Sequence, residues 1–294
     1  MQLARLSPIF LTLAVTLVSA TAAVGSDLDK RIDQDYHGKV LTLRQFADGS
    51  RLRCGPDGKL VGKAGKTSWT TDSEIEVETL RLKGKVLELK GKRLRLVYDP
   101  VHKQFRDVLT ILPGDEIAKH LREPRNAVAW TQLIKSTEVE IDLDLGSTPQ
   151  KESDLTTALG RLFVSSNDEF LNLVPAFWKG FLSRKDLDSP VAEPASDGSA
   201  YTVGGDVTAP RPLTASNPSY SELAREAGYS GTVVLQLVVT PEGHVSDVSI
   251  TTPIGLGLDE EAAETVGGWT FEPGRKAGVP VAVRISTEVN FSLY

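Results

Sequence analysis

Acidic side chains alternate with apolar ones over residues 138 to 145, which read Glu-Val-Glu-Ile-Asp-Leu-Asp-Leu. Such carboxylates could bind a cation, or a pair such as Glu138 and Asp142 could act as the acid and base of a hydrolase. On a β-strand, neighbouring side chains of one face lie roughly 7 Å apart, too far to share one ion without help from other segments. We therefore favour an acidic strand face paired beside basic strands such as residues 81 to 85, and keep the hydrolase as an alternative.

Few other residues have the spacing that catalysis or metal binding needs. The chain has one cysteine, Cys54, so no intramolecular disulfide can form, and we expect its thiol to be a small buried apolar group. The four histidines, at positions 37, 102, 120 and 244, lack ligand spacing. Gly-x-Ser-x-Gly, phosphate-binding glycine loops and His-Glu-x-x-His are absent from the sequence. We expect no enzymatic activity, no cofactor and no metal.

The net charge of −6 hides two regions of opposite sign. Residues 38 to 107 contain 16 Lys and Arg against 9 Asp and Glu, whereas residues 201 to 294 contain 5 against 11. The basic residues between 81 and 95 alternate with leucine, which is typical of a solvated strand face or of a surface for anionic envelope polymers. We expect no nucleic-acid binding.

The N-terminus has the three-part pattern of a secretory signal over residues 1 to 22. A single Arg5 precedes the apolar run Ile9 to Val18, and Ala20-Thr21-Ala22 offers a cleavage site of small residues. The apolar run is shorter than the roughly 20 residues that span a bilayer. We predict export with cleavage after Ala22, with an uncleaved membrane anchor as the alternative.

Apolar and polar residues alternate from Lys39 to Tyr98, with glycine-containing turns between them, which predicts a β-meander of hairpins. The parity of the apolar residues changes between Val77 and Leu80. Since one extra residue transfers the apolar set to the other parity, we expect a bulge near Thr79.

Three helical patterns follow the meander within the first domain, which we place at residues 27 to 185. One starts at Ser153, a second at the capping box Ser166 to Glu169, and a third after Pro175. The third carries an aromatic stripe of Phe177, Trp178 and Phe181. We predict that these helices cover one face of the meander.

Residues 186 to 212 are rich in proline and glycine, which predicts a linker before a second domain at residues 213 to 294. In that domain the pattern is helix, strand, strand, helix, strand, with the second helix capped by Asp259 and a single long strand from Val279 to Tyr294. The whole chain is predicted to be α+β, and the second domain to contain a three-stranded antiparallel sheet.

The motifs of the last third together resemble the TonB C-terminal domain family over residues 201 to 294. They include Tyr220-Ser-Glu-Leu-Ala-Arg225, Gly257-Leu258-Asp259, Trp269-Thr-Phe271-Glu-Pro273 and Gly278-Val-Pro280-Val281. The resemblance assigns structural roles to eight residues, namely Tyr220, Gly231, Gly243, Leu258, Asp259, Trp269, Phe271 and Pro273. Ser221 stands where the family has the proline of a Tyr-Pro pair.

The resemblance implies a periplasmic module that grips outer-membrane TonB-dependent transporters by strand pairing and relays energy from an inner-membrane, proton-driven complex. Two features depart from the usual transducer. The run Ile9 to Val18 has no histidine, and the linker extends to at most roughly 90 Å, shorter than the family's long proline-rich rod. An envelope adaptor that binds without transducing energy is therefore an alternative.

The last strand is the expected site of action. A three-stranded sheet leaves at least one edge with unpaired backbone groups, and β-augmentation at that edge uses main-chain hydrogen bonds. The expected partner-binding residues are Val281, Val283, Arg284, Ile285, Ser286, Glu288, Asn290 and Phe291. The alternatives are an edge protected by Arg284 and Glu288, and an edge paired in a homodimer.

Overall fold

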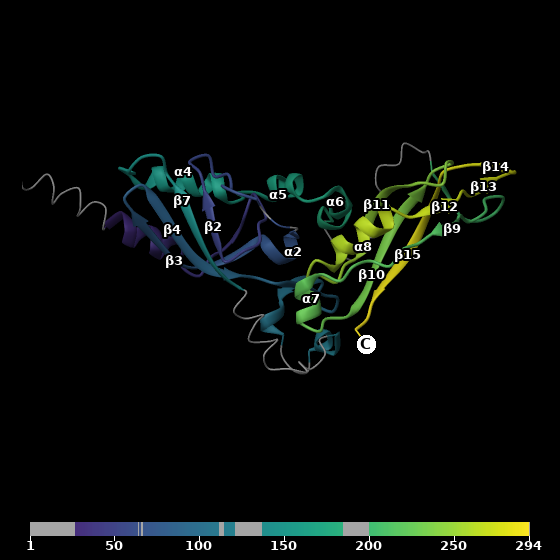
Figure 1. Ribbon diagram of the computed structural model, residues 1–294, viewed down its shortest axis with the longest axis horizontal. Helices are drawn as coiled ribbons and strands as arrows, with labels where there is room; N and C mark the ends of the chain where they lie inside the picture. The colour runs from purple at the N-terminus through teal and green to yellow at the C-terminus, as the bar shows by residue number, and fades with distance from the viewer. Residues whose placement is uncertain are drawn as a thin grey trace, which may run out of the picture.

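The computed structural model describes residues 27–63, 65, 67–111, 115–120, 137–184 and 200–293. The expected signal sequence, residues 1 to 22, lies outside this part of the chain. Within it, no helix combines the length and the apolar character that a membrane crossing requires. Figure 1 shows an elongated molecule with one sheet toward each end and a layer of short elements between them. The predicted α+β class is confirmed.

The N-terminal sheet has five strands in the order β1-β3-β4-β7-β2. They are β1 (Val40–Thr42), β2 (Arg51–Cys54), β3 (Glu74–Lys83), β4 (Val86–Arg93) and β7 (Glu138–Asp144). The predicted bulge is confirmed, because the β3–β4 register shifts between Val77 and Thr79. β7 enters between β4 and β2 and runs parallel to β2, a long-range pairing that the predicted meander does not include.

One face of this sheet packs against helices that are close to it in sequence. A helix over residues 27–36 and α4 (Glu152–Leu162) contribute Leu28, Ile32, Leu155 and Leu159 to a cluster with the inward side chains of β2, β3, β4 and β7. α4 begins after Lys151 instead of at Ser153, because the Asp154 carboxylate accepts the backbone N–H groups of Gln150 and Lys151.

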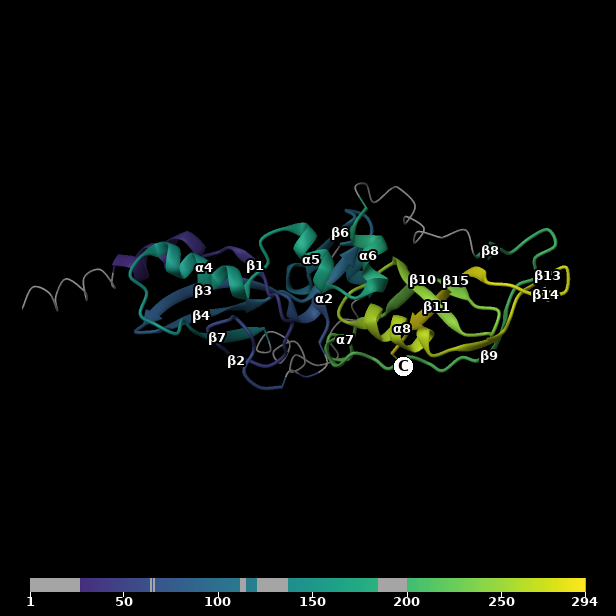
Figure 2. The same cartoon turned by 90° about the horizontal axis from the view of Figure 1, so that it is seen from above.

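Short elements fill the middle of the molecule (Figure 2). They are α2 (Trp69–Asp72), β5 (Leu96–Asp99), β6 (Gln104–Asp107), the 3-10 turns Val108–Thr110 and Glu116–His120, α5 (Asn167–Leu173) and α6 (Ala176–Leu182). Ser166 caps α5 as predicted, since its hydroxyl accepts the N–H of Glu169. α4 covers the N-terminal sheet as predicted, whereas α6 lies against β11 of the other sheet.

The C-terminal sheet has the strand order β11-β10-β15-β8. The elements after residue 200 are β8 (Tyr201–Thr202), β9 (Arg211–Thr214), α7 (Glu222–Glu226), β10 (Gly231–Val239), β11 (Val245–Thr252), α8 (Leu258–Gly267), β12 (Thr270–Glu272), β13 (Arg275–Lys276), β14 (Val279–Pro280) and β15 (Val283–Phe291). The order α7, β10, β11, α8, β15 confirms the predicted pattern. The predicted three-stranded antiparallel sheet corresponds to β11, β10 and β15, and β8 adds a fourth strand that runs parallel to β15. The predicted single strand from Val279 is two strands, because β14 pairs with β13 and β15 starts after it.

The predicted linker is described only in its second part, since residues 185–199 lie outside the described chain. Residues 200–212 contain β8 and the start of β9, which pair with β15 and β12. The division into two domains stays a prediction. Limited proteolysis tests it, because first cuts inside residues 186 to 212 would support it and first cuts inside residues 38 to 100 would contradict it.

A second hydrophobic cluster crosses the predicted domain boundary. It joins Trp69, Val97, Trp178 and Phe181 to the inward side chains of β10, β11, β15 and α8. Backbone bonds cross the same junction, from Leu256 N to Leu96 O at 2.8 Å and from Tyr98 N to Ile254 O at 2.9 Å. The core of the C-terminal sheet is therefore built partly from the N-terminal half.

Candidate partner-binding edge

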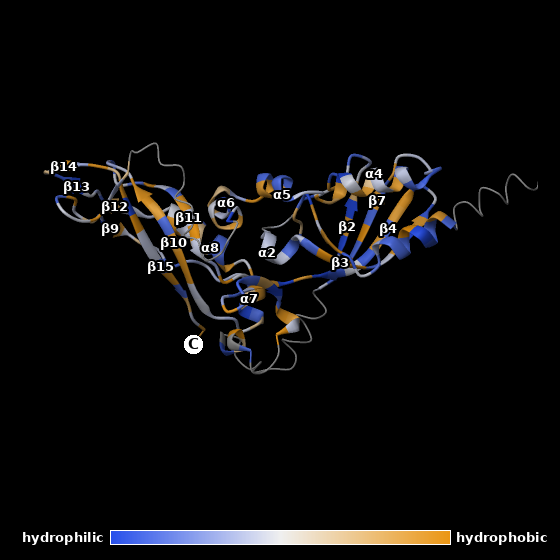
Figure 3. Cartoon of the chain, turned by 180° about the vertical axis from the view of Figure 1, so that it is seen from behind, coloured by the Kyte–Doolittle hydropathy of each residue, from blue (hydrophilic) through white to orange (hydrophobic). Residues whose placement is uncertain are grey.

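β15 is the strand that the sequence predicts to bind a partner. One edge pairs with β10 from Val283 to Phe291 without a register shift, and β10 is the apolar centre of the sheet (Figure 3). On the other edge, among the described residues, the only paired strand is β8, which runs parallel to β15 at Val283 and Arg284. Over residues 285–291 this outer edge has no described partner strand.

The direction of the backbone groups follows from one bond at the β8 end. Tyr201 N donates to Ala282 O at 2.8 Å, so the carbonyl of residue 282 points to the outer edge. Along a strand, the N–H and C=O groups of alternate residues point to the same edge. The backbone donors and acceptors of Ser286, Glu288 and Asn290 therefore point outward, and those of the odd-numbered residues point to β10.

The side chains of the predicted site divide by parity. Ser286, Glu288 and Asn290 are exposed, whereas Val283 and Phe291 are buried and Ile285 is half-buried on the side of the core. Val281 precedes the strand and is held by its N–H, which donates to Gly274 O at 2.9 Å. The edge thus combines outward backbone groups with exposed polar side chains at three alternate positions.

Arg284 departs from the expected pattern. The sequence places it on the solvent face, but the structure buries it to 8% exposure beside its strand neighbour Val238, which is 5% exposed. This is the end of the strand at which β8 joins the sheet. Arg284 is therefore not an exposed charged residue that protects the open edge from strand addition.

The opposite edge of the sheet, along β11, is less suited to strand addition. Its pairing with β10 has two register shifts, and Asp247 adopts a left-handed conformation with φ of 50°. α6 lies against the same strand. Bulges and covering elements are the usual protection of an exposed edge.

Several of the predicted structural residues hold the turns at either end of the sheet. The Tyr220 hydroxyl donates to Tyr229 O at 2.9 Å, and its ring meets Phe291 edge-on at 5.4 Å. Ser221, at the family's proline position, caps α7 by accepting the N–H of Ala224 and also donates to Leu256 O. Serine at position 221 therefore preserves the start of α7, although the family has proline there.

The hairpin between β10 and β11 is fixed by Gly243, whose φ is 83°. A side chain there would overlap the Phe271 carbonyl, and Phe271 N donates to Gly243 O at 2.8 Å. Trp269 donates from its indole to Ser216 O at 3.0 Å. Gly231 starts β10 against Ile254, Leu258 is fully buried at the start of α8, and Pro273 follows β12.

Asp259 does not cap α8, contrary to the sequence prediction. Gly257 occupies the cap position, and the Asp259 carboxylate accepts the N–H groups of Ile254 and Gly255 at 2.8 and 2.6 Å. Burial and the neighbouring Glu260 raise the pKa of Asp259, against the lowering effect of these two bonds. Asp259 therefore holds the loop that contacts β5, and it does not cap the start of α8.

Comparison with known proteins identifies this part of the chain. A family model described as the Gram-negative bacterial TonB protein C-terminal matches residues 216–293. Residues 216–293 form a TonB C-terminal domain. The curated protein TonB of Vibrio cholerae serotype O1 is 34% identical over 77 residues. The alignment covers 26% of this chain and 32% of that protein, so the chain spans about a third of the length of its curated relative.

A solved structure of the same family was also found. The solution NMR structure of the Pseudomonas aeruginosa TonB CTD is 23% identical. The match covers 32% of this chain and 93% of that structure, with a TM-score of 0.26.

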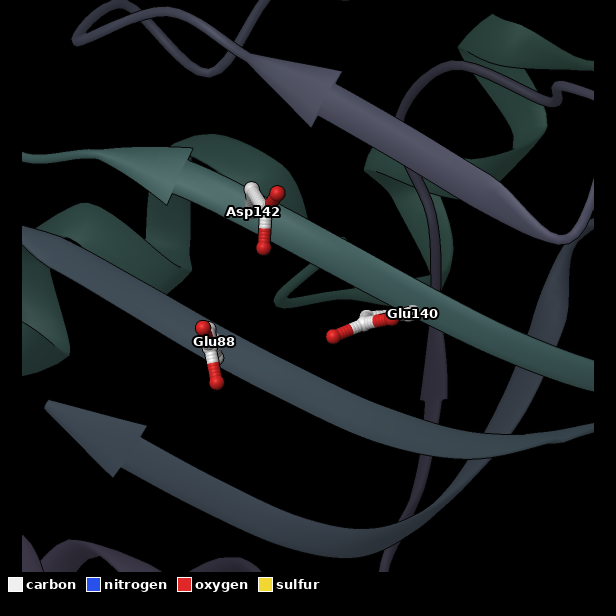
Figure 4. A group of neighbouring side chains, drawn as sticks. All are labelled: Glu88, Glu140 and Asp142. Carbon is white, nitrogen blue, oxygen red and sulfur yellow. The ribbon is translucent and has the colours of Figure 1, made fainter. Parts of the chain in front are cut away.

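The acidic face of β7, outside the TonB C-terminal domain, is neutralised by neighbouring strands. Carboxylate oxygens of Glu88, Glu140 and Asp142 lie within 4.8 Å of one another (Figure 4). Arg51 binds Glu140 at 2.6 Å, and Lys90 lies 3.6 Å from it. The acidic strand does lie beside basic residues, but these belong to β2 and β4. Residues 81 to 83 of the predicted basic partner lie in β3, which is flanked by β1 and β4, and within 81 to 85 Lys85 reaches Asp144 of β7 at 3.5 Å. The group of three carboxylates excludes Glu138, which the hydrolase alternative used.

The junction between the N-terminal half and the TonB C-terminal domain was missed by the sequence reasoning. Asp72 Oδ1 lies 3.2 Å from Arg93 and 3.1 Å from Arg95, and all three side chains are buried. Burial lowers the pKa of Arg93 to about 10, against the raising effect of Asp72. The sequence contains one indication that Arg93 is buried, because Arg93 has the same parity on β4 as the inward residues Leu87 and Leu89.

Proposed function

We propose that this protein is a periplasmic TonB-like protein that binds outer-membrane TonB-dependent transporters and supports energy-coupled transport, without enzymatic turnover. The observation that carries the proposal is the outer edge of β15. The outward backbone groups of Ser286, Glu288 and Asn290 have no described partner strand and fit the addition of an extended peptide. The TonB C-terminal domain supports the choice of a transporter as the partner.

The proposal is tested by proline substitution along β15. Ser286→Pro and Asn290→Pro each remove one outward N–H, and we expect each to weaken binding of transporter plug-segment peptides by roughly tenfold, with a modest loss of stability. Ser286→Ala is the matched control, because it removes the side chain and keeps the backbone donor. Titration calorimetry measures affinity, and circular dichroism verifies folding.

The outcome that contradicts the proposal is an unchanged affinity of both folded proline variants. Sedimentation of the peptide-free chain tests the homodimer alternative, since β15 edges that pair with each other would produce a dimer that the same prolines dissociate.

An adaptor without energy transduction is supported by the packing of the N-terminal half onto the TonB C-terminal domain. Two measurements distinguish it from a transducer. The intact mass of the mature protein shows whether residues 1 to 22 are retained as an anchor, and transport in the presence of a protonophore shows whether the protein contributes proton-driven uptake.

A further inference from the structure

Glu288 is the charged residue on the open edge of β15. The exposed side chains over residues 285–291 are those of Ser286, Glu288 and Asn290. All three lie on the face of the sheet that is opposite to α6 and α8 (Figure 1). Only the glutamate carries a charge, so the electrostatic character of this stretch depends on Glu288.

The side chains of Ser286 and Asn290 turn toward β10. The Ser286 hydroxyl donates to a β10 carbonyl oxygen at 3.3 Å, and the Asn290 amide donates to Thr232 Oγ1 at 3.2 Å. Glu288 instead lies opposite Val234, whose apolar side chain offers a carboxylate no hydrogen bond. Two of the three exposed polar side chains are therefore bound within the sheet, whereas the carboxylate remains available to a strand that joins the outer edge.

The carboxylate of Glu288 also has no compensating cation. It forms no ion pair or hydrogen bond with any residue in the part of the chain that the structure describes. Arg284, the one basic residue of β15, is buried at the β8 end, about 13 Å away along the strand. Opposite charges that face each other across two strands stabilise the pairing, and like charges oppose it. The edge therefore favours a basic side chain on an incoming strand.

The other face of β15 restricts the neighbouring positions of such a strand. Ile285 is half-buried, and Val289 and Phe291 are buried, on the side of the helices. Successive side chains of a strand point to opposite faces. The residues on either side of the one beside Glu288 would therefore lie next to this apolar surface, where apolar side chains are favoured.

We propose that the open edge of β15 selects an extended peptide that places a lysine or arginine beside Glu288 and apolar residues at the two adjacent positions. This inference rests on the proposed function, because it assigns the chemistry of the strand that the edge accepts. It differs from a protective role for Glu288. A protective charge weakens the binding of every peptide, whereas a selective carboxylate favours one charge and disfavours the other.

A charge scan of a transporter plug-segment peptide tests the proposal. Lysine, glutamine and glutamate replace each residue of the peptide in turn, and titration calorimetry with the full chain measures each affinity. At one position we expect the lysine peptide to bind about threefold more tightly than the glutamine peptide, and the glutamate peptide about threefold more weakly. The preference should shrink at high ionic strength, because the pair is exposed.

Charge reversal in the protein identifies the carboxylate that is responsible. Glu288→Lys should reverse the preference at that same peptide position, and Glu288→Gln should remove it. Glu242→Lys is the matched control, because it makes the same change of charge at an exposed residue of the β10–β11 hairpin, outside β15. It should leave the preference unchanged, and circular dichroism verifies that each variant is folded.

Two results would overturn the proposal and leave the proposed function standing. One is peptide binding without a charge preference at any position, or with the same preference in Glu288→Lys as in wild type. The other is tighter binding of all peptides, uncharged ones included, to Glu288→Gln, which would show that Glu288 protects the edge. If no peptide binds the wild-type chain, the proposed function fails and this inference fails with it.

Discussion

The N-terminal sheet packs against helices that lie near it in the sequence, and the described residues of its hydrophobic cluster all lie between Leu28 and Phe163. The cluster of the C-terminal sheet extends from Trp69 to Phe291 and includes α6 from the other half. The first sheet therefore has a core of its own, whereas the TonB C-terminal domain has a core that is completed across the predicted domain boundary. The residues that match the TonB family model therefore do not mark the limits of the hydrophobic core around that domain.

The two sheets also differ in how they present polar groups. The exposed face of the N-terminal sheet is covered by ion pairs between strands, such as Arg51 with Glu140 and Lys85 with Asp144. The C-terminal sheet instead leaves backbone groups of β15 at an edge without a described partner strand. Ion pairs between strands therefore engage the polar side chains of the first sheet, whereas the second sheet retains an edge that can accept a further strand.

Trp178→Ala should have the largest effect on stability. This fully buried side chain of α6 packs against the TonB C-terminal domain. We expect the free energy of unfolding to fall by about 3–5 kcal/mol in chemical denaturation of the full chain. Leu173→Ala on neighbouring α5 is the control, since Leu173 is 38% exposed. Equal losses in the two variants would mean that the C-terminal sheet does not depend on this cover.

Asp72→Asn should have the next largest effect. It leaves the buried guanidinium groups of Arg93 and Arg95 without their shared carboxylate, which should cost about 3 kcal/mol of unfolding free energy. Lys85→Met, which breaks the exposed pair with Asp144, should produce no measurable loss. A loss as large for Lys85→Met would contradict the distinction between buried and exposed ion pairs.

Glu260→Gln should change how stability depends on pH. Burial raises the pKa of Glu260 above 4.5, so between its ordinary and its raised pKa the folded state binds more protons than the unfolded state. Stability contributed by this group is complete below pH 4.5 and declines as the pH rises. Denaturation from pH 4 to pH 8 should therefore show the variant gaining stability relative to wild type as the pH rises, and a constant difference would contradict this.

Cys54 should give the smallest effect, because the N-terminal core shields it. Burial raises the pKa of its thiol to about 11, and the side chain is 5% exposed. We expect iodoacetamide at pH 8 to label the folded chain far more slowly than the chain in denaturant, as followed by mass spectrometry. Equal rates would show that the N-terminal core opens freely.

Much of the local structure could be predicted because it depends on neighbouring residues. Alternation with a change of parity predicted the bulge at Thr79, and the Ser166 hydroxyl predicted the start of α5. The motifs around Tyr220, Gly243 and Trp269 predicted the TonB C-terminal domain, because turns and close approaches restrict which residues fit. The outward parity of Ser286, Glu288 and Asn290 on β15 was also contained in the sequence.

Only the tertiary structure decided which surfaces meet. The aromatic stripe of α6 predicts burial, yet nothing in its spacing distinguishes the N-terminal sheet from β11 as its partner. Asp259 is suited to a helix cap, but in the folded chain its carboxylate accepts the buried N–H groups of Ile254 and Gly255. The burial of Arg284 and the parallel pairing of β2 with β7 both join distant segments, and local periodicity carries no information about such contacts.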